Sequence, residues 1–360
     1  MDSAGPATID LARSRLGEPA FTPFRPRAPW WGGDLQTLHN FFKPGPPRLD
    51  AAAEERLYLP VADGTGDRLA AALAHPAGGP AARLPLVVLI HGLGGSEASF
   101  YMIRSAAHLL RQGYPVLRLN LRGAGPSRPY CRFQYHAGRT GDLADALAGL
   151  PPWLTRHGIA AVGYSLGGNL LLKYLGETGT RSALRAAVTV SAPLDLAATS
   201  RRMSRPRNRI YELYLLHGMK QESLAPGAEL SVEERWVIQR AESIRTFDER
   251  FTAPRNGFDG ADDYYRRTSS EGFLDGIAMP TLLIHALDDP WVPSEPYCRR
   301  AWADNPSLRP LLPSRGGHVG FVGRDPVPWH DLAIARFLAT LFSPPLGQPA
   351  LSRRAASTAE

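Results

Sequence analysis

Continuous apolar stretches alternate with amphipathic stretches along most of this chain. Residues 84–92, LPLVVLIHG, form an apolar run rich in β-branched side chains, which is typical of a strand buried on both faces of a parallel sheet. Similar runs recur at 115–123, 158–165 and 184–193. Strands that alternate with helices predict βαβ units, and therefore an α/β fold with a mostly parallel central sheet flanked by helices.

The stretches between these runs carry apolar residues at helical spacing, and they predict helices within 97–114, 138–150 and 166–177. The alternation stops near residue 195. It resumes at 280–289 with another strand-like run, and a closing helix is expected at 329–342. The intervening segment 195–275 holds helical patches followed by aromatic and acidic loops, so we expect a helical cap inserted over the sheet.

The two ends of the chain differ from this alternating centre. The first 50 residues are rich in proline and tryptophan, and they predict an extended arm without a helix that packs on the core. Residues 55–64 and 67–76 predict a strand pair around a glycine turn. The expected organisation is an arm at 1–50, a core at 51–194 and 276–343, a cap or lid at 195–275, and a disordered tail at 344–360.

Length and composition are those of a globular protein. The 360 residues allow one large α/β domain or two ordinary ones, and 44% of them are apolar. No run approaches the about 18 uninterrupted apolar residues of a membrane span. The first 20 residues lack a basic start followed by an apolar core, so a cytoplasmic location is expected. Cys131 and Cys298 form no disulfide framework or metal pattern.

The net charge of +7 raises the question of an anionic partner. Only three of the 41 basic residues are lysines, and the arginines are scattered apart from the cluster SRRMSRPRNR at 200–209. We therefore interpret them as solvated surface residues, some paired with carboxylates, and expect no nucleic-acid partner. A basic patch that attracts anionic lipid or substrate is the secondary interpretation. A monomer is the default expectation.

Residues 163–168, GYSLGG, match the Gly-X-Ser-X-Gly pattern of a nucleophile elbow. The motif lies between a strand-like and a helix-like run, which is the context that this turn requires. Glycine is expected to be required at positions 163 and 167, because any Cβ there would collide with a neighbouring strand or helix. The pattern predicts an exposed Ser165 hydroxyl above helix N-terminal amides that stabilise developing negative charge.

A serine nucleophile needs a histidine base, which follows the serine in this type of fold. The chain after Ser165 contains His217, His285, His318 and His330. His217 lies in the predicted cap, and His285 lies inside an apolar strand run. His318 lies in a glycine-rich loop directly after a strand, whereas His330 lies at an expected helix start. We favour His318 as the base.

The histidine needs a carboxylate partner at the end of the preceding strand. The stretch LLIHALDDPWVP at 282–293 offers Asp288 and Asp289. The Asp-Pro-X-X-Pro sequence favours a turn that directs Asp289 toward the imidazole, with Asp288 as a turn-forming neighbour. Because adjacent residues point to different sides, only one of them is expected to serve.

Two backbone amides are needed to hold an oxyanion. We expect them from Leu166, which follows the serine, and from Leu93 in the HGLGG loop after the first long strand. Gly92 and Gly94 would let this backbone approach a substrate closely. Tyr164, adjacent to the serine, completes the substrate-binding candidates of the core.

The predicted cap supplies candidates for an apolar acyl pocket. We expect substrate contacts from Tyr211 and Trp236, together with Tyr214, Leu215 and Leu216. The expected partner is a small-molecule or lipid ester, without stable membrane insertion.

Several longer motifs are similar to those of the α/β-hydrolase superfamily, in the YheT-like branch related to the ABHD lipases. They are PWWGGDLQTL, HGLGGSEASFY, LNLRGAGPS with YHAG, GYSLGGN, DDPWVP and GGHVGF, and the resemblance covers residues 22–342. It implies a serine hydrolase of the carboxylic ester type, with its triad on Ser165, Asp289 and His318. Tyr135, His136, Gly138 and Arg122 also resemble features of this branch, and we interpret them as structural support for the loop beside the elbow.

The expected reaction is hydrolysis of short- to medium-chain or lipid-like esters through an acyl-enzyme on Ser165. It requires no metal and no organic cofactor. Dehalogenase and epoxide hydrolase chemistry needs a carboxylate at position 165 and is excluded. An acyltransferase would use the same triad, and a non-catalytic binding protein on this fold would usually have lost a member of it. Both remain as alternatives.

Overall fold

The structure is a computed structural model, which describes residues 21–42, 49, 51–77 and 84–342. Parts of the predicted arm (1–20, 43–48 and 50) and the predicted tail at 344–360 lie outside the described residues.

The described residues form a central sheet of eight strands in the order β1-β2-β4-β3-β5-β6-β7-β8. The pairs β1–β2 and β2–β4 are antiparallel, and the remaining neighbours are parallel. The mostly parallel sheet predicted from the alternating pattern is therefore confirmed. The strands are β1 (Ala51–Pro60), β2 (Arg68–Pro76), β3 (Leu86–Ile90), β4 (Val116–Leu119), β5 (Ile159–Tyr164), β6 (Leu184–Val190), β7 (Thr281–Ile284) and β8 (Leu308–Leu311).

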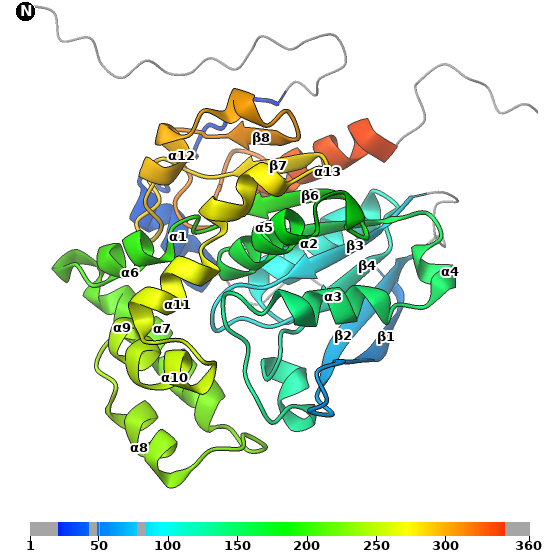
Figure 1. The fold of residues 1–360 in the computed structure, drawn as a ribbon. Coiled ribbons are helices and arrows are strands. Elements are labelled where there is room, and N and C mark those ends of the chain that lie inside the picture. Colours follow the sequence, from blue (N-terminus) through cyan, green and yellow to red (C-terminus); the bar gives the residue numbers. More distant parts are fainter. Residues whose placement is uncertain (1–20, 43–48, 50, 78–83, 343–360) are drawn as a thin grey trace, which may run out of the picture.

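Helices cover both faces of this sheet (Figure 1). Within β3, Val88 belongs to the apolar cluster on the side of α3 (Thr140–Ala148) and α5 (Leu166–Thr178). The adjacent Leu89 belongs to the cluster on the side of α2 (Phe100–Arg111) and α13 (Trp329–Phe342). Both faces of the strand are thus buried, which explains its uninterrupted apolar sequence.

Further short helical elements complete the core. Between β4 and β6 lie η1 (Gly125–Tyr130), α4 (Pro152–Thr155) and η2 (Gly179–Arg181), and between β7 and β8 lie α12 (Glu295–Arg299) and η6 (Trp302–Asp304).

The segment between β6 and β7 packs as a helical layer beside the carboxyl ends of the parallel strands (Figure 1). Two apolar clusters hold it together, one of them around Leu216, Ile238 and Phe247. Its elements are α6 (Leu196–Met203), η3 (Pro206–Asn208), α7 (Arg209–Leu224), α8 (Val232–Arg240), α9 (Ile244–Phe247), the π-helical segment η4 (Asp248–Thr252), α10 (Ala253–Arg255), α11 (Ala261–Thr268) and η5 (Ser270–Gly276). We call this segment the cap. The domain boundaries given above remain a prediction.

The prediction of an arm without a helix is wrong, because residues Gly33–Phe42 form helix α1. Residues 33–42 contain no proline, and Asp34 in the first turn favours a helix start by its charge. The tryptophans that suggested an extended arm lie before this helix, and the prolines lie in the sequence on both sides of it. Pro26 pairs with Gly323 in an isolated β-bridge. The arm therefore reaches the core through both an extended segment and a helix.

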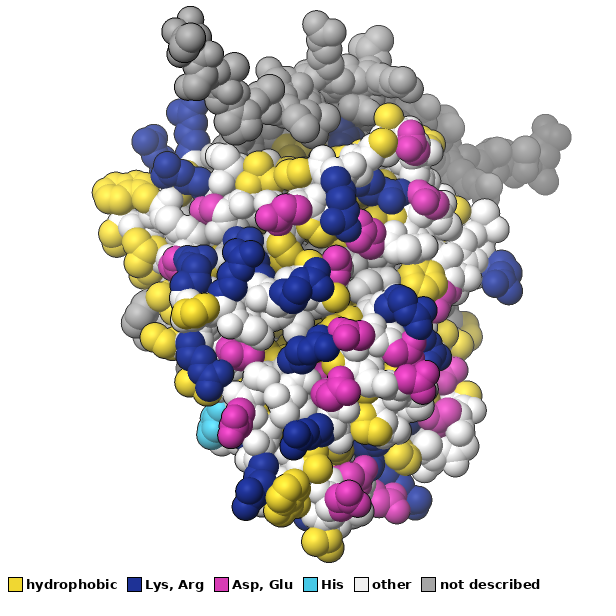
Figure 2. All heavy atoms as spheres, turned by 60° about the vertical axis from the view of Figure 1, so that its left-hand side comes forward, with side chains coloured by type: hydrophobic (Ala, Val, Ile, Leu, Met, Phe, Trp, Pro, Cys, Tyr) yellow, Lys and Arg dark blue, Asp and Glu magenta, His cyan; other side chains and the backbone are white. Residues whose placement is uncertain are grey.

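Charged side chains of both signs intermingle on the face of the molecule in Figure 2. Several arginines pair with carboxylates at the surface, such as Arg207 with Asp34 at 2.8 Å and Arg245 with Asp262 at 2.8 Å. No helix in the described part of the chain is long and apolar enough to cross a membrane.

Candidate active site

The turn between β5 and α5 has the strained geometry that the GYSLGG motif predicts. Ser165 adopts φ 50° and ψ −121°, a conformation that non-glycine residues rarely adopt. A Cβ on Gly163 would lie 2.6 Å from the Gly167 carbonyl oxygen, and a Cβ on Gly167 would lie 2.3 Å from the His91 carbonyl oxygen. The two glycines are thus required by close backbone packing, as predicted.

Ser165, His318 and Asp289 lie in one chain of hydrogen bonds. The Ser165 Oγ is 2.9 Å from His318 Nε2, and His318 Nδ1 is 2.8 Å from Asp289 Oδ2. The other Asp289 oxygen, Oδ1, accepts the backbone N–H groups of Trp291 at 2.8 Å and Val292 at 3.0 Å. The turn after β7 therefore orients the carboxylate toward the imidazole.

The ionisation of Asp289 follows from these contacts. Burial opposes the charged form, but the facing His318 and the Val292 amide outweigh it, and the pKa of Asp289 lies below its ordinary value. An ionised Asp289 can only accept a hydrogen bond, so His318 Nδ1 carries a proton and donates a hydrogen bond to it. His318 Nε2 is then the acceptor for the Ser165 hydroxyl.

Asp288, His285 and His330 lie elsewhere in the fold, whereas His217 lines the same cavity as Ser165 without a hydrogen bond to it among the described residues. Asp288 Oδ1 accepts the Gly317 N–H at 2.9 Å, so this side chain supports the backbone of the histidine loop. The His285 ring stacks on Tyr297 with 4.2 Å between ring centroids and is fully buried. His330 is buried at the start of α13.

The two predicted oxyanion donors are the backbone amides of Leu166, the first residue of α5, and of Leu93, which follows Gly92. Among the described residues, neither amide donates a hydrogen bond to a protein group, which leaves both available to an oxyanion. Gly92 lies directly against Ser165, because a Cβ there would be 2.9 Å from the Ser165 Cβ. Any other residue at this position would displace the serine.

His91 fixes the start of the loop that carries Leu93. Its Nε2 accepts the Leu121 N–H at 3.0 Å, so its Nδ1 carries the proton and donates to the Gly92 carbonyl oxygen at 2.8 Å. Burial lowers the pKa of His91 to about 4, although the hydrogen bond to Gly92 acts in the opposite direction and raises it. The ring therefore stays neutral and keeps this tautomer at physiological pH.

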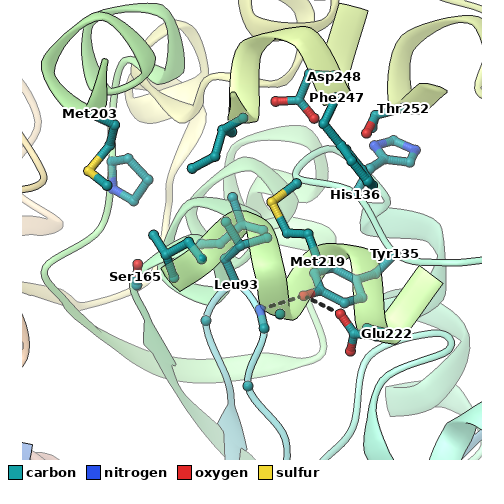
Figure 3. A pocket seen from close by; sticks show the side chains of 18 of the residues that line it. Leu93, Tyr135, His136, Ser165, Met203, Met219, Glu222, Phe247, Asp248 and Thr252 are labelled. Atoms are coloured by element: carbon teal, nitrogen blue, oxygen red, sulfur yellow. Dashed lines mark hydrogen bonds between the residues drawn. The ribbon is translucent and has the colours of Figure 1, made fainter. Parts of the chain in front are cut away.

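A cavity of about 570 Å³ extends from Ser165 between the core and the cap (Figure 3). Leu93 and Met219 lie between the serine and the far side of the cavity, where Phe247 and Asp248 are found. Most of its lining is apolar. Its wall includes the predicted residues Gly92, Leu93, Gly94, Leu166, Tyr214 and Leu215.

Tyr164, Tyr211 and Trp236, predicted to bind substrate, do not line this cavity. The Tyr164 side chain is fully buried below the site, where its hydroxyl donates to Ser105 Oγ at 2.6 Å. Trp236 is 51% exposed and lies beside Arg240 on the surface of the cap. The prediction that these three residues bind substrate is wrong, because strand alternation and helix rotation turn their side chains away from the cavity.

Tyr211 instead joins the cap to the arm and to the turn after Asp289. Its hydroxyl donates to Asp34 Oδ1 at 3.0 Å, and its ring packs edge-on against Trp291. The apolar Leu216, also expected at the pocket, is buried in the cap interior.

Trp291 is a site residue that the sequence reasoning missed. Its ring stacks on the His318 imidazole with 4.5 Å between centroids, and it lines the cavity. Its position two residues after Asp289 in the DDPWVP motif could have indicated that it lies near the site.

Two carboxyl groups line the part of the cavity remote from Ser165. Burial raises the pKa of Glu222 to about 7, opposed by hydrogen bonding from Tyr135, and burial raises the pKa of Asp248 to about 6. Asp248 accepts the Tyr265 hydroxyl at 2.7 Å. Within the described ranges, no group of three or more His, Cys, Asp or Glu side chains is placed to hold a metal ion.

Comparison with known proteins agrees with this fold. The family described as the alpha/beta hydrolase fold matches residues 85–325. YheT of Escherichia coli, an esterase by name, is 35% identical over 265 residues, which span 71% of this chain and 77% of YheT. Phospholipase ABHD3 of Bos taurus is 32% identical over 241 residues, which span 66% of this chain and 58% of that protein. The Saccharomyces cerevisiae medium-chain fatty acid ethyl ester synthase/esterase 2 is 32% identical over 280 residues, spanning 71% of this chain and 62% of its own length.

Solved structures share the fold at lower identity. The Pyrococcus furiosus esterase Pf2001 superimposes with a TM-score of 0.52 at 18% identity, covering 84% of this chain and 99% of the esterase. The matching family and the relatives support a hydrolase. This chain belongs to the α/β-hydrolase superfamily, in the branch that contains YheT and the ABHD-type proteins.

Proposed function

We propose that this protein is a serine esterase that cleaves carboxylic esters of short- to medium-chain or lipid-like acids. The observation that carries the proposal is the hydrogen-bond chain from Ser165 Oγ through His318 to Asp289, with distances of 2.9 and 2.8 Å. These distances allow proton transfer from the hydroxyl to the imidazole without rearrangement.

The reaction proceeds in two steps. As Ser165 Oγ attacks the ester carbonyl carbon, His318 Nε2 removes its proton, and the carbonyl oxygen becomes an oxyanion bound by the Leu93 and Leu166 amides. The C–O bond to the alcohol then breaks, and His318 returns the proton to the leaving oxygen. Water, deprotonated by His318, attacks the acyl-enzyme, which releases the acid and regenerates Ser165. Asp289 stabilises the imidazolium in both steps.

The acyl group is assigned to the cavity between the core and the cap. Leu93, Leu215, Met219, Phe247 and Phe251 provide an apolar wall that begins beside Ser165. An apolar wall favours an alkyl chain, because its burial there removes apolar surface from water. The acyl groups of these esters are therefore proposed to be fatty rather than charged.

Covalent labelling tests the nucleophile. The wild-type protein should react with a fluorophosphonate probe, with the label on the peptide that contains Ser165, and should hydrolyse nitrophenyl esters of increasing chain length. Ser165→Ala should lose both labelling and turnover while its circular dichroism spectrum is unchanged. If Ser165→Ala labels and turns over like the wild type, the proposal is wrong.

An acyltransferase reaction is the second candidate, and the name of the yeast relative joins a synthase with an esterase. Both reactions share the acyl-enzyme on Ser165 and differ only in the acceptor. Product analysis in the presence of ethanol separates them. Free acid as the main product supports the esterase, whereas ester formation in excess of free acid at low ethanol concentration supports the transferase.

A further inference from the structure

The loop that carries His318 has a strained backbone. Gly316 and Gly317 have φ values of 146° and 58°, and the non-glycine residues Val319 and Phe321 have values of 56° and 47°. A positive φ at a non-glycine residue costs on the order of 1 kcal/mol or more. The loop therefore needs contacts from outside to hold the imidazole in place.

Helix α1 of the arm supplies two of these contacts from a segment 281 or more positions away in the sequence. The His318 N–H donates to Thr37 Oγ1 at 2.8 Å, and the Val322 N–H donates to Gln36 Oε1 at 2.6 Å. Gln36 Nε2 also donates to the Val322 carbonyl oxygen at 3.2 Å. Gln36 and Thr37 are 0% and 2% exposed, so water does not replace these bonds.

The direction of the Thr37 contact is determined by a second hydrogen bond. The Thr37 hydroxyl donates its own proton to the Gly33 carbonyl oxygen at 2.7 Å, within α1. Its lone pair therefore faces the His318 N–H, and the hydroxyl acts as a fixed acceptor.

Backbone packing between α1 and the site loops is very close. A Cβ on Gly317 would lie 2.3 Å from the Gly33 carbonyl oxygen, and a Cβ on Gly320 would lie 2.4 Å from the Gln36 carbonyl oxygen. On the other side of the helix start, a Cβ on Gly33 would lie 2.0 Å from the Asp288 carbonyl oxygen. The helix thus contacts the backbone beside both His318 and Asp289.

We propose that α1 is the positioning element of the catalytic histidine, with Thr37 and Gln36 as positioning residues that set the distance from His318 Nε2 to Ser165 Oγ. This inference rests on the proposed function and goes beyond it. It assigns a role to the GDLQTL part of the arm, which the reaction itself does not use.

Replacement of the Thr37 hydroxyl tests the proposal. Thr37→Val has nearly the same shape but leaves the buried His318 N–H without an acceptor. We expect kcat for a nitrophenyl ester to fall by at least about tenfold with little change in KM, because small displacements of a catalytic group reduce rate more than binding. Thr37→Ser should restore most of kcat, since it keeps the acceptor.

Thr340→Val is the matched control. Thr340 also donates to a carbonyl oxygen within its helix, at 2.9 Å, but it is exposed and accepts no loop amide. It should keep wild-type kinetics. A Thr37→Val enzyme with wild-type kcat, or a loss that Thr37→Ser does not repair, would overturn the proposal.

Amide hydrogen exchange tests the same contact in the wild-type protein, so the main result does not require that Thr37→Val folds. In the wild-type protein, the His318 amide should exchange slowly although it lies in a loop, and Thr37→Ser should keep this protection. Rapid exchange of this amide in the wild type would contradict the inference. Ser165→Ala, measured in parallel, separates the two proposals. If Ser165→Ala is active, the proposed esterase is refuted. If Ser165→Ala is inactive and Thr37→Val has the kcat of the wild type, only the role of α1 is refuted.

Discussion

The hydroxyl of Tyr135 donates a hydrogen bond to the carboxyl group of Glu222 over 3.2 Å, across the boundary between core and cap (Figure 3). The same hydroxyl accepts the N–H of Gly94 at 2.8 Å. Gly94 directly follows Leu93, whose amide is assigned to the oxyanion. A cap side chain is therefore linked through a single core tyrosine to the loop that carries Leu93.

Tyr135→Phe removes this link without changing the ring. The Gly94 N–H loses its acceptor, so the Leu93 amide should be held less rigidly and stabilise the oxyanion less well. We expect kcat to fall by about tenfold, less than the about 10²–10³ for direct loss of an oxyanion donor. Tyr130→Phe, at an exposed tyrosine pair with Tyr58, is the control. An unchanged kcat in Tyr135→Phe would exclude a role of this link in catalysis.

Glu222 should make stability depend on pH near neutrality. Burial raises its pKa from 4.5 to about 7, opposed by the hydrogen bond from Tyr135 and the charge of Arg128. Between these values the folded protein holds a proton that the unfolded chain has lost, so the free energy of unfolding falls as the pH rises through this window.

Glu222→Gln removes that dependence. The melting temperature of Glu222→Gln minus that of the wild type should increase from pH 5 to pH 8, as measured by differential scanning fluorimetry. Glu55→Gln, at an exposed glutamate on β1, should show a constant difference. A Glu222→Gln difference that stays constant or decreases with pH would argue against a neutral Glu222 in the folded state.

The two adjacent aspartates should differ sharply in their kinetic effect. Asp289→Asn loses the charge that holds the His318 tautomer, and kcat should fall by roughly 10³–10⁴-fold. Asp288→Asn keeps an oxygen that can accept the Gly317 N–H, and it should retain most activity. Steady-state kinetics on both variants measure this difference. A larger loss of kcat in Asp288→Asn than in Asp289→Asn would exchange the two roles.

Met219 should limit the length of the acyl chain. It projects into the cavity between Leu93 and Glu222 (Figure 3), so Met219→Trp would fill that space. We expect kcat/KM for decanoyl and dodecanoyl esters to fall by at least about tenfold, with acetyl and butyryl esters little affected. Leu213→Trp, at a half-exposed position on the same helix, should leave the chain-length profile unchanged. Equal losses at all chain lengths would place the acyl group elsewhere.

Gly167 should tolerate no side chain. In Gly167→Ala the new Cβ meets backbone oxygen atoms of His91 and Ile90 at 2.3 and 2.7 Å, and the clash should cost about 1–3 kcal/mol or more of stability. Gly218→Ala, in the middle of α7 with no atom within 4 Å of the new Cβ, should instead stabilise by about 0.5–1 kcal/mol. Urea unfolding of both variants measures this difference directly, and equal midpoints would contradict it.

Local signals in the sequence predicted much of the core. The apolar runs at 84–92 and 158–165 predicted buried parallel strands, because every residue of such a strand faces a packed layer. The closing helix predicted at 329–342 is observed as α13 with the same bounds. The arm helix α1 was missed because the prolines on both sides of it and the tryptophans before it dominated the interpretation of the whole segment.

The cap was harder to predict, because helical spacing alone does not say which face of a surface helix meets the core. Tyr211 and Trp236 are aromatic and lie in the correct segment, yet the cavity is lined by Tyr214, Leu215 and Met219. The orientation of α7 and α8 depends on the packing of Leu216, Ile238 and Phe247 against one another. Such packing among separate helices is not visible in the spacing of any one of them.

The sequence by itself determined the parallel core and the nucleophile turn, because strand burial and the glycines around Ser165 act between residues close together in the chain. It also pointed to His318 and Asp289 through their places after successive strands. Only the tertiary structure decided which distant groups meet there: Thr37 beneath His318, Trp291 on the imidazole and Glu222 at Tyr135. These contacts join segments far apart in sequence, and their geometry depends on how the arm, the loops and the cap pack together.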